Sequence, residues 1–396
     1  MSPELEGSLR SANWPRRPGL ETLTRALGAE NVRWVGGAVR DTLLGVEAQD
    51  IDCATPLTPQ DVMELCARAD IRTVPTGIEH GTVTAILEDG TVEITTLRKD
   101  VATDGRRAAV AFATDWREDA ARRDFTINAL YAHPETLEIS DYFGGLEDLG
   151  ARRVRFIGNP RERIAEDHLR ILRYFRFQAR FGAELDDEAE SACADMADTL
   201  KGLSRERIAS ELLALLRLPD PHATIARMRS LGVLPVILPE SCPPQIEALE
   251  TLIATEREQA IEPSALRRLA ALLPPSPDVA EGVAARLRLS KAQRARLIAA
   301  SERLAEDKAA PHALAYSIGK DFAIDRMLLL GGDANELESF ELPIFPLKGG
   351  EIVARGVAAG PQVARIMQLV ERRWVDEGFP TRARVDEILE EELSRG

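Results

Sequence analysis

Two acidic residues near the N-terminal end have a spacing that suits metal binding. Asp50 and Asp52 lie two positions apart in the stretch DIDCA, residues 50–54. In a β-strand, residues i and i+2 share a face, so both carboxylates would point the same way while Ile51 points into the core. Two carboxylates this close repel unless a cation lies between them, and hard oxygen ligands suit Mg²⁺. Two solvated acids at the end of a strand would show the same pattern, so the pair alone leaves both interpretations open.

A third acidic residue, Glu93, lies in the second arm of a predicted hairpin. Val92 and Ile94 flank it, so its side chain faces opposite to theirs. A single Glu in a strand usually faces solvent. On a strand adjacent to the acidic pair, however, Glu93 would complete a site for two metal ions. One ion would lower the pKa of an attacking hydroxyl, and the other would hold a leaving pyrophosphate.

A glycine-rich turn precedes the acidic pair in VGGAVRD, residues 35–41. Gly36 and Gly37 predict a strand-to-helix turn in which backbone N–H groups approach phosphate oxygens. Arg40 lies on the following helix, where it could reach a triphosphate. The alternatives are a plain turn for the glycines and a surface salt bridge for the arginine.

The stretch ARRDFTINALY, residues 121–131, predicts a helix with polar residues on one face. Asp124 and Asn128 are four residues apart and would share that face. A carboxylate at this place could accept a hydrogen bond from a ribose hydroxyl, and Arg123 would add positive charge near phosphate. A helix-capping ion pair is the alternative.

The stretch RIAEDHLRILRYFRFQARFG, residues 163–182, predicts one amphipathic helix. Asp167, Arg170 and Tyr174 would share a face, where an Asp–Arg pair is usually an ordinary ion pair. The same pair could also recognise a base edge. The carboxylate would accept from the amino group of cytosine or adenine, and the guanidinium would donate to the adjacent ring nitrogen. Uracil and guanine present the reverse order, and each unpaired group costs about 1–3 kcal/mol, so the pair would accept C and A and reject U and G without a template.

The elements that must position these residues are short strands and helices within about the first 150 residues. Residues 32–35 and 50–54 are expected to be strands, and residues 38–44 a helix that follows the glycines. Asp89-Gly90 is a strong signal for the two-residue turn of a hairpin.

Two further signals complete the N-terminal part. Thr58 is the expected N-cap of a helix, and the polar segment 98–117 is predicted to be a mobile loop beside the site. From about residue 160 onward, helical spacing continues almost throughout. The expected fold class is therefore α+β, with a small mixed sheet in the head and an all-helical remainder.

The composition fits a soluble globular protein. The 396 residues are 44% hydrophobic and 29% charged, with a formal net charge of −15. The four cysteines form no CxxC pair, which predicts reduced thiols and no zinc site. No apolar run approaches the ~20 residues that span a bilayer, and the N-terminus lacks an apolar signal core. The net charge disfavours nucleic acid, but nine arginines against three acids in residues 151–182 allow a local basic surface.

Taken together, these stretches resemble the class II CCA-adding enzymes (tRNA nucleotidyltransferases) of the class II tRNA nucleotidyltransferase/poly(A) polymerase family. The resemblance covers about residues 30–185 and rests on the order and spacing of VGGAVRDTLLG, DIDCAT, GIEHGTVTAIL, VEITTLR, RRDFTINALY and EDHLRILRYFRF. It implies a polymerase-β-like nucleotidyltransferase head followed by an all-helical neck, body and tail. The implied bounds are 1–150 for the head, 151–215 for the neck, 216–305 for the body and 306–396 for the tail.

The resemblance also implies roles for single residues. Asp50 and Asp52 match the metal-binding pair, and Glu93 matches the third catalytic carboxylate. Segment 98–117 matches a flexible element involved in the switch from C to A addition. The implied nucleotide-binding residues are Gly36, Gly37, Arg40, Arg123, Asp124, Asn128, Glu166, Asp167, Arg170 and Arg173.

The implied reaction is template-independent addition of CCA to the 3′ end of tRNA from CTP and ATP, with two Mg²⁺ ions. The body and tail would hold the acceptor stem and upper half of tRNA by shape and backbone contacts, and residues 286–297 are either a basic patch for RNA or a solvated helix.

We expect a cytoplasmic location and no membrane, DNA or protein partner. Enzymes that add only CC or only A, a poly(A) polymerase, and a catalytically silent RNA-binding protein remain alternatives. None of the five histidines precedes an aspartate, so no appended phosphohydrolase is expected.

Overall fold

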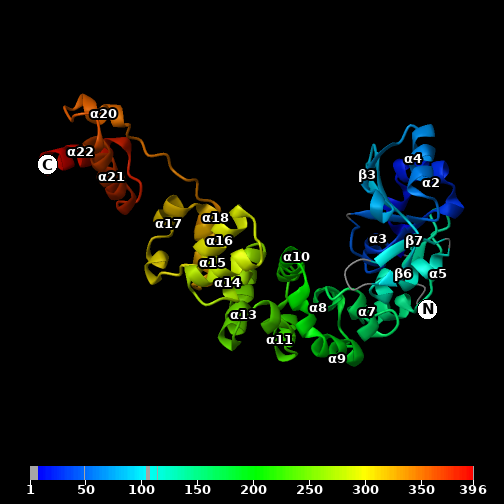
Figure 1. Cartoon of the computed structure of the whole chain (residues 1–396). Helices are drawn as coiled ribbons and strands as arrows, with labels where there is room; N and C mark the ends of the chain where they lie inside the picture. Colours follow the sequence, from blue (N-terminus) through cyan, green and yellow to red (C-terminus); the bar gives the residue numbers. More distant parts are fainter. Residues whose placement is uncertain (1–7, 49, 104–107, 114, 396) are drawn as a thin grey trace. The chain divides into compact units, whose positions relative to one another are not determined.

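The computed structural model describes residues 8–48, 50–103, 108–113 and 115–395. The chain divides into two compact units (Figure 1). The first comprises Met1–Leu215 with Ala223–Ile237, and the second comprises Leu216–His222 with Leu238–Gly396. The finer division into head, neck, body and tail stays a prediction.

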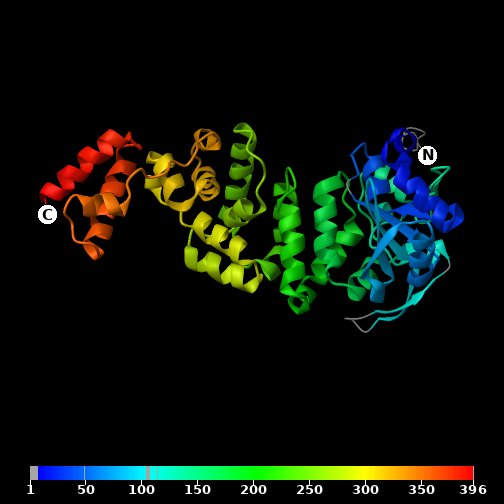
Figure 2. The ribbon, with the colours of Figure 1, turned by 90° about the horizontal axis from the view of Figure 1, so that it is seen from above.

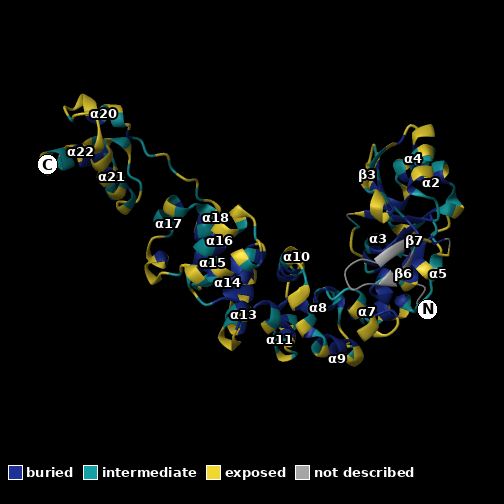
Figure 3. Cartoon of the chain, in the orientation of Figure 1, coloured by how far each residue is buried: buried dark blue, intermediate teal, exposed yellow. Residues whose placement is uncertain are grey.

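The first unit contains the small mixed sheet that the sequence predicts. Its strand order is β3-β4-β5-β2-β1-β8-β9, with β2 and β5 parallel and every other neighbouring pair antiparallel. The predicted hairpin is present, but Leu87 pairs with Gly90, so its two turn residues are Glu88 and Asp89, one position before the predicted Asp89-Gly90 pair. Buried residues line the inner strands of the sheet, whereas the edge strands β3 and β9 have none (Figure 3). The bounds are β1 Arg33–Val35, β2 Ile51–Thr55, β3 Arg72–Gly77, β4 Thr82–Leu87, β5 Gly90–Thr96, β8 Leu130–Ala132 and β9 Ile139–Asp141.

Short helices connect and cover these strands. Thr58 is the N-cap of α4, as predicted, and it forms a reciprocal capping box with Asp61. The α-helices are α2 Pro18–Leu27, α3 Gly37–Leu43, α4 Pro59–Arg68, α5 Trp116–Ala121 and α6 Gly145–Gly150. The 3₁₀ helices are η1 Trp14–Arg16, η2 Ala29–Asn31, η3 Ile78–His80 and η4 Thr126–Asn128.

The prediction of a loop over residues 98–117 is wrong for most of the segment. Strands β6 (Arg98–Thr103) and β7 (Ala108–Phe112) pair antiparallel as a separate two-stranded sheet, which extends away from the larger sheet (Figure 2). Helix α5 then begins at Trp116. Residues 104–107 and 114 lie outside the described residues.

The rest of the first unit is helical, as predicted from residue 160 onward. Helix α8 packs on the head through aromatic rings: Phe125 lies 4.9 Å from Phe156, and Phe156 lies 5.9 Å from Tyr174 between ring centroids. These contacts fix α8 against the turn that carries the RRDFTIN stretch. The helices are α7 Pro160–Glu166, α8 Arg170–Phe181, α9 Asp187–Asp195, η5 Ala197–Gly202, α10 Arg205–Leu216, α11 His222–Ser230 and α12 Val233–Ile237.

The second unit is also helical. Its first part contains a buried ionic network in which Glu256 accepts hydrogen bonds from Arg267 and Arg268, each at 2.7 Å. Its last part has an apolar core that includes Val370 and Trp374. The helices are α13 Pro243–Glu258, α14 Ala265–Ala271, α15 Pro277–Arg286, α16 Lys291–Ser301, η6 Ala305–Ala309, α17 Pro311–Ile318, α18 Lys320–Leu329, α19 Asn335–Glu338, α20 Gly349–Ala354, α21 Pro361–Asp376 and α22 Arg382–Arg395.

Three other expectations from the sequence have a structural outcome. All four cysteines are free thiols. Within the described ranges, no helix combines the length and apolar composition needed to cross a bilayer. In segment 286–297, Arg286, Arg294 and Arg296 form ion pairs with Glu240, Glu281 and Asp325, respectively, which reduces the positive charge that this segment offers to RNA.

Candidate active site

A cavity of about 520 Å³ in the first unit brings most of the predicted site residues together. Its volume lies within the range of small-molecule sites. Of the predicted residues, only Asp50 and Glu166 are outside its lining. The lining comprises Val35, Gly36, Gly37, Arg40, Asp52, Cys53, Thr82, Glu93, Thr95, Arg98, Arg122, Arg123, Asp124, Asn128, Asp167, Arg170, Arg173 and Phe177.

The acidic wall of the cavity is formed by neighbouring strands. Asp52 on β2 pairs with Glu93 on β5 in parallel register, so both side chains lie on one face of the sheet. Ile51 is buried, as predicted. Asp50 is exposed and precedes β2 by one residue. Burial raises the pKa of Asp52, and the negative charges of Glu93 and Asp50 raise it further.

These carboxylates suit Mg²⁺. Among the residues described, no three His, Cys, Asp or Glu side chains lie close enough to share one ion. Mg²⁺ in proteins commonly takes one or two carboxylates and completes its shell with water and substrate phosphates. Burial and then the negative charges of Glu93 and Asp50 raise the pKa of Asp52, and a bound cation would offset these effects. Asp50 and Asp52 therefore fit the ion, with Glu93 beside them.

The glycine turn lies between this acidic wall and a basic one. Gly36 has a φ of 67° and is the N-cap of α3, a conformation that L side chains rarely adopt. A Cβ at Gly36 would lie 3.6 Å from both Asp52 Oδ2 and Arg123 Nη1. The turn thus brings backbone, carboxylate and guanidinium to one end of the cavity.

Arg40 is buried, so the alternative of a surface salt bridge is wrong. Its guanidinium pairs with Asp41 at 2.7 Å and donates to the Asn128 side chain. It also lies 5.2 and 4.7 Å from the ring centroids of Phe177 and Phe181. Burial lowers the pKa of Arg40, although Asp41 opposes this effect. Arg40 is thus a fixed cation in the cavity wall.

The RRDFTIN stretch is not the helix that the sequence predicted. Helix α5 ends at Ala121, and the stretch forms the 3₁₀ turn η4 before strand β8. The turn still brings Asn128 Nδ2 within 2.9 Å of Asp124 Oδ1, while Arg173 donates to Asp124 Oδ2 at 2.6 and 2.8 Å. Burial acts to raise the pKa of Asp124, but Arg173 and Asn128 outweigh it and hold that pKa below its usual value.

The stretch 163–182 is two helices, so the predicted single face for Asp167 and Arg170 is wrong. Asp167 is in extended conformation between α7 and α8, and its Oδ1 accepts from the backbone N–H of Leu169 at 3.1 Å. Such a local bond competes with helical hydrogen bonding. Arg170 pairs with Glu166 instead of Asp167. Both base-recognition candidates nevertheless line the cavity.

Helix α10 has two residues that contact the cavity lining without being part of it, and the sequence analysis did not identify them. Arg207 pairs with Asp167 at 2.7 Å. One turn later, Glu211 accepts from Arg176 at 2.6 Å and from Arg173 at 3.4 Å. The i, i+4 spacing of two charges on one helix face was the available signal, but nothing in the sequence assigned that face to this cavity.

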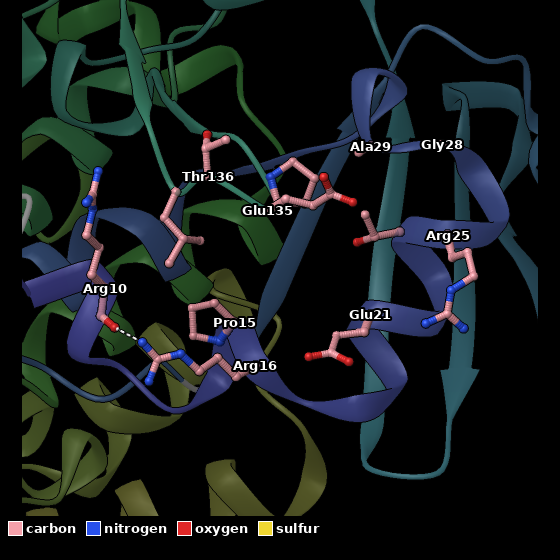
Figure 4. A pocket seen from close by; sticks show the side chains of 12 residues that line it. Arg10, Pro15, Arg16, Glu21, Arg25, Gly28, Ala29, Glu135 and Thr136 are labelled. Carbon is pink, nitrogen blue, oxygen red and sulfur yellow. Dashed lines mark hydrogen bonds between the residues drawn. The ribbon is translucent and has the colours of Figure 1, made fainter.

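A second cavity, of about 720 Å³, lies elsewhere in the first unit and contains none of the predicted site residues. Glu21 and Arg25 project from α2, with Pro15 and Arg16 across from them (Figure 4). Arg16 donates to the backbone oxygen of Arg10. The predicted site residues therefore line the smaller cavity and not the larger one.

Comparisons with known proteins identify relatives of this chain. The family model "Poly A polymerase head domain" matches residues 32–155, and "Probable RNA and SrmB- binding site of polymerase A" matches residues 182–243. The chain is 36% identical over 392 residues to the mitochondrial CCA tRNA nucleotidyltransferase 1 of Mus musculus, covering 94% of this chain and 89% of that protein.

Two solved structures share the fold. The Bacillus stearothermophilus CCA-adding enzyme in complex with CTP has a TM-score of 0.76 and 24% identity, covering 100% of this chain and 99% of that one. The Thermotoga maritima CCA-adding enzyme complexed with tRNA has a TM-score of 0.70 and 22% identity, covering 99% and 98%.

The mixed sheet with its acidic and basic cavity walls defines a nucleotidyltransferase head of the poly(A) polymerase type. Because the similarity extends over nearly the whole length of a curated relative, the chain belongs to the family of CCA tRNA nucleotidyltransferases, the class II CCA-adding enzymes.

Proposed function

We propose that the 520 Å³ cavity is where this chain transfers nucleotides from CTP and ATP to the 3′ end of tRNA, adding C, C and A in order. The observation that carries the proposal is the pairing of Asp52 with Glu93 in one cavity that Arg40 and Arg123 also line. That arrangement places metal-binding carboxylates beside cations able to hold a triphosphate.

The protein's own residues bind and orient the reactants. Asp50 and Asp52 would hold Mg²⁺, with Glu93 as the third carboxylate. Bound there, Mg²⁺ would lower the pKa of the attacking 3′-hydroxyl and neutralise charge on the leaving pyrophosphate. Arg40 and Arg123 would supply positive charge for the triphosphate, and hydrogen bonds to Asp41 and to the Tyr131 hydroxyl orient their guanidinium groups.

Base selection would fall to the residues at the break between α7 and α8. A carboxylate has about four lone-pair sites, so Asp167 can accept from a base amino group while Arg207 and Leu169 hold its two oxygens. Arg170 would donate to the adjacent ring nitrogen of cytosine or adenine. Glu166 fixes Arg170 for that task.

The partner would be tRNA, with RNA contact confined to one face because the net charge is −15. The body and tail would bind its acceptor stem and upper half, and the proposed location is the cytoplasm. The cavity residues favour an enzyme over a silent RNA-binding protein, because a binder has no need of repelling carboxylates beside a phosphate site.

An incorporation assay tests the proposal. Purified protein with Mg²⁺ is given tRNA transcripts that end at the discriminator base, at C or at CC, with CTP and ATP singly and together. Sequenced 3′ ends that stop at CCA support full addition. Stopping at CC, action only on the CC-ended transcript, or long A tails would identify a partial adder or a poly(A) polymerase instead.

A further inference from the structure

Asp119 is a buried carboxylate that lines no part of the cavity yet contacts the residues that do. Its side chain is 2% exposed and lies on α5. Oδ1 accepts hydrogen bonds from Arg122 Nε at 2.8 Å and from the backbone N–H of Arg98 at 3.1 Å. Oδ2 accepts from the Tyr131 hydroxyl at 2.6 Å and from Arg123 Nη2 at 3.4 Å. Four groups from three parts of the head therefore converge on one carboxylate.

This carboxylate stays ionised in the folded protein. Burial acts to raise the pKa of Asp119, but Arg123, Arg122 and the Tyr131 hydroxyl outweigh it and hold the pKa below its usual value. A buried charge is tolerated only when it is paired and hydrogen-bonded. Hydrogen bonds and ion pairs thus link Asp119 to each of its four partners.

Two of these partners belong to different parts of the head, the β6–β7 hairpin and the cavity wall beside the glycine turn. Arg98 is the first residue of β6, so its N–H fixes the base of the β6–β7 hairpin to Asp119. Arg123 faces the glycine turn, where its Nη1 would lie 3.6 Å from a Cβ at Gly36, and its Nε donates to the Tyr131 hydroxyl at 2.8 Å. Asp119 therefore lies between the hairpin base and the arginine nearest the turn.

We propose that Asp119 is a positioning residue that joins Arg123 to the β6–β7 hairpin, so that a nucleoside triphosphate bound at Arg123 also restrains the hairpin. The proposal rests on the proposed function, because it takes CTP or ATP as the ligand of the cavity. A ligand that fixes Arg123 also fixes Asp119, and the Arg98 N–H then has a better-ordered acceptor. Ordering one group lowers the cost of ordering the next.

Amide hydrogen exchange of the full chain tests this coupling. Exchange is followed in residues 97–103 and 108–113 with and without saturating CTP, in the absence of tRNA. Tyr131→Phe removes the hydroxyl that Asp119 and Arg123 share, and Asp119→Asn removes the charge.

Asp148→Asn is the matched control, because Asp148 is fully buried and pairs with Arg153 and Arg155 outside the cavity lining.

In the wild type and in Asp148→Asn, CTP should slow exchange at the hairpin base about tenfold, the factor that corresponds to one hydrogen bond of ordinary strength. In Tyr131→Phe and Asp119→Asn, saturating CTP should slow it by less than about twofold. Tyr131→Phe keeps the test decisive if Asp119→Asn does not fold.

Equal slowing in the wild type and in Tyr131→Phe would overturn the coupling, as would CTP binding to the wild type without slowed exchange. Failure of the wild type to bind CTP in calorimetry would instead count against the proposed nucleotide site, and against the coupling with it.

Discussion

Asp52 and Glu93 are direct neighbours across the parallel strands β2 and β5. Their charges repel, and burial together with Glu93 raises the pKa of Asp52. A fold selected for stability alone would not place two carboxylates here. The repulsion is consistent with a site that binds a cation and a polyanionic substrate together.

Neutralising Glu93 should change the ionisation of Asp52. In Glu93→Gln, loss of the neighbouring negative charge should move the pKa of Asp52 down toward its ordinary value, while nucleotide incorporation falls by orders of magnitude. Carboxyl-carbon NMR titration of the metal-free protein measures the pKa. Glu88→Gln is the control, because Glu88 is exposed in the turn that follows β4. An unchanged pKa of Asp52 in Glu93→Gln would contradict the repulsion between Glu93 and Asp52.

Magnesium should stabilise the protein through Asp52. Added to chelator-treated protein, Mg²⁺ at a hundred times its dissociation constant should raise the free energy of unfolding by about 2.7 kcal/mol. The gain should vanish in Asp52→Asn. Thermal melts at constant ionic strength measure it, with Asp61→Asn as the control, since Asp61 is the exposed acid of the α4 capping box. Equal gains in both variants would place the ion elsewhere.

Arg207 should act on nucleotide affinity through Asp167. Arg207→Ala leaves the carboxylate of Asp167 without its 2.7 Å partner. We expect the KM for CTP and ATP to rise about fivefold to tenfold with little change in kcat, because one charge-assisted hydrogen bond that orients the carboxylate is lost.

Arg161→Ala is the matched control for Arg207→Ala. It breaks an exposed ion pair with Asp195 in the same helical region, and such pairs contribute little. Steady-state kinetics with saturating tRNA separates KM from kcat. A fall in kcat at unchanged KM, or equal effects in both variants, would rule out the positioning role.

The stability of the first unit should depend on acid pH through Asp124. Its folded pKa lies below the usual value because Arg173 and Asn128 outweigh burial. Its contribution is therefore complete above the unfolded value of about 3.9 and is lost as pH falls through the lower folded value. Urea unfolding of Asp124→Asn and wild type should show a large difference at pH 7 that shrinks below about pH 4. If the difference in unfolding free energy between wild type and Asp124→Asn grew on acidification, it would contradict the lowered pKa assigned to Asp124.

Local patterns in the sequence were enough to predict the acidic wall and the glycine turn. Alternation in β2 and β5 determines the face of Asp52 and Glu93, and only glycine suits the φ of Gly36. The Thr58 cap is equally local, and so is the hairpin, although its turn is formed by Glu88 and Asp89, one position before the predicted pair. Each feature depends on a few adjacent residues, so a single sequence contains its cause.

Other parts of the site depend on partners far along the chain. Asp167 interrupts the expected helix with a side-chain bond to Leu169, and its ion-pair partner Arg207 is forty residues away. Asp119 gathers Arg98 and Tyr131 from separate strands. Pairing of β6 (Arg98–Thr103) with β7 (Ala108–Phe112) likewise overrode a polar composition typical of loops. Tertiary contacts decide these features, and periodicity does not report them.

The most direct test of the central claim is 3′-end sequencing of tRNA transcripts incubated with CTP, ATP and Mg²⁺, for the wild type, Asp52→Asn and the control Asp61→Asn. The account predicts that the wild type and Asp61→Asn add C, C and A and then stop. Asp52→Asn should bind tRNA equally well but add nucleotides at least about a thousandfold more slowly, since the metal ligand is lost. CCA addition at the wild-type rate by Asp52→Asn, or no addition by the wild type, would contradict the assignment of this cavity as the active site.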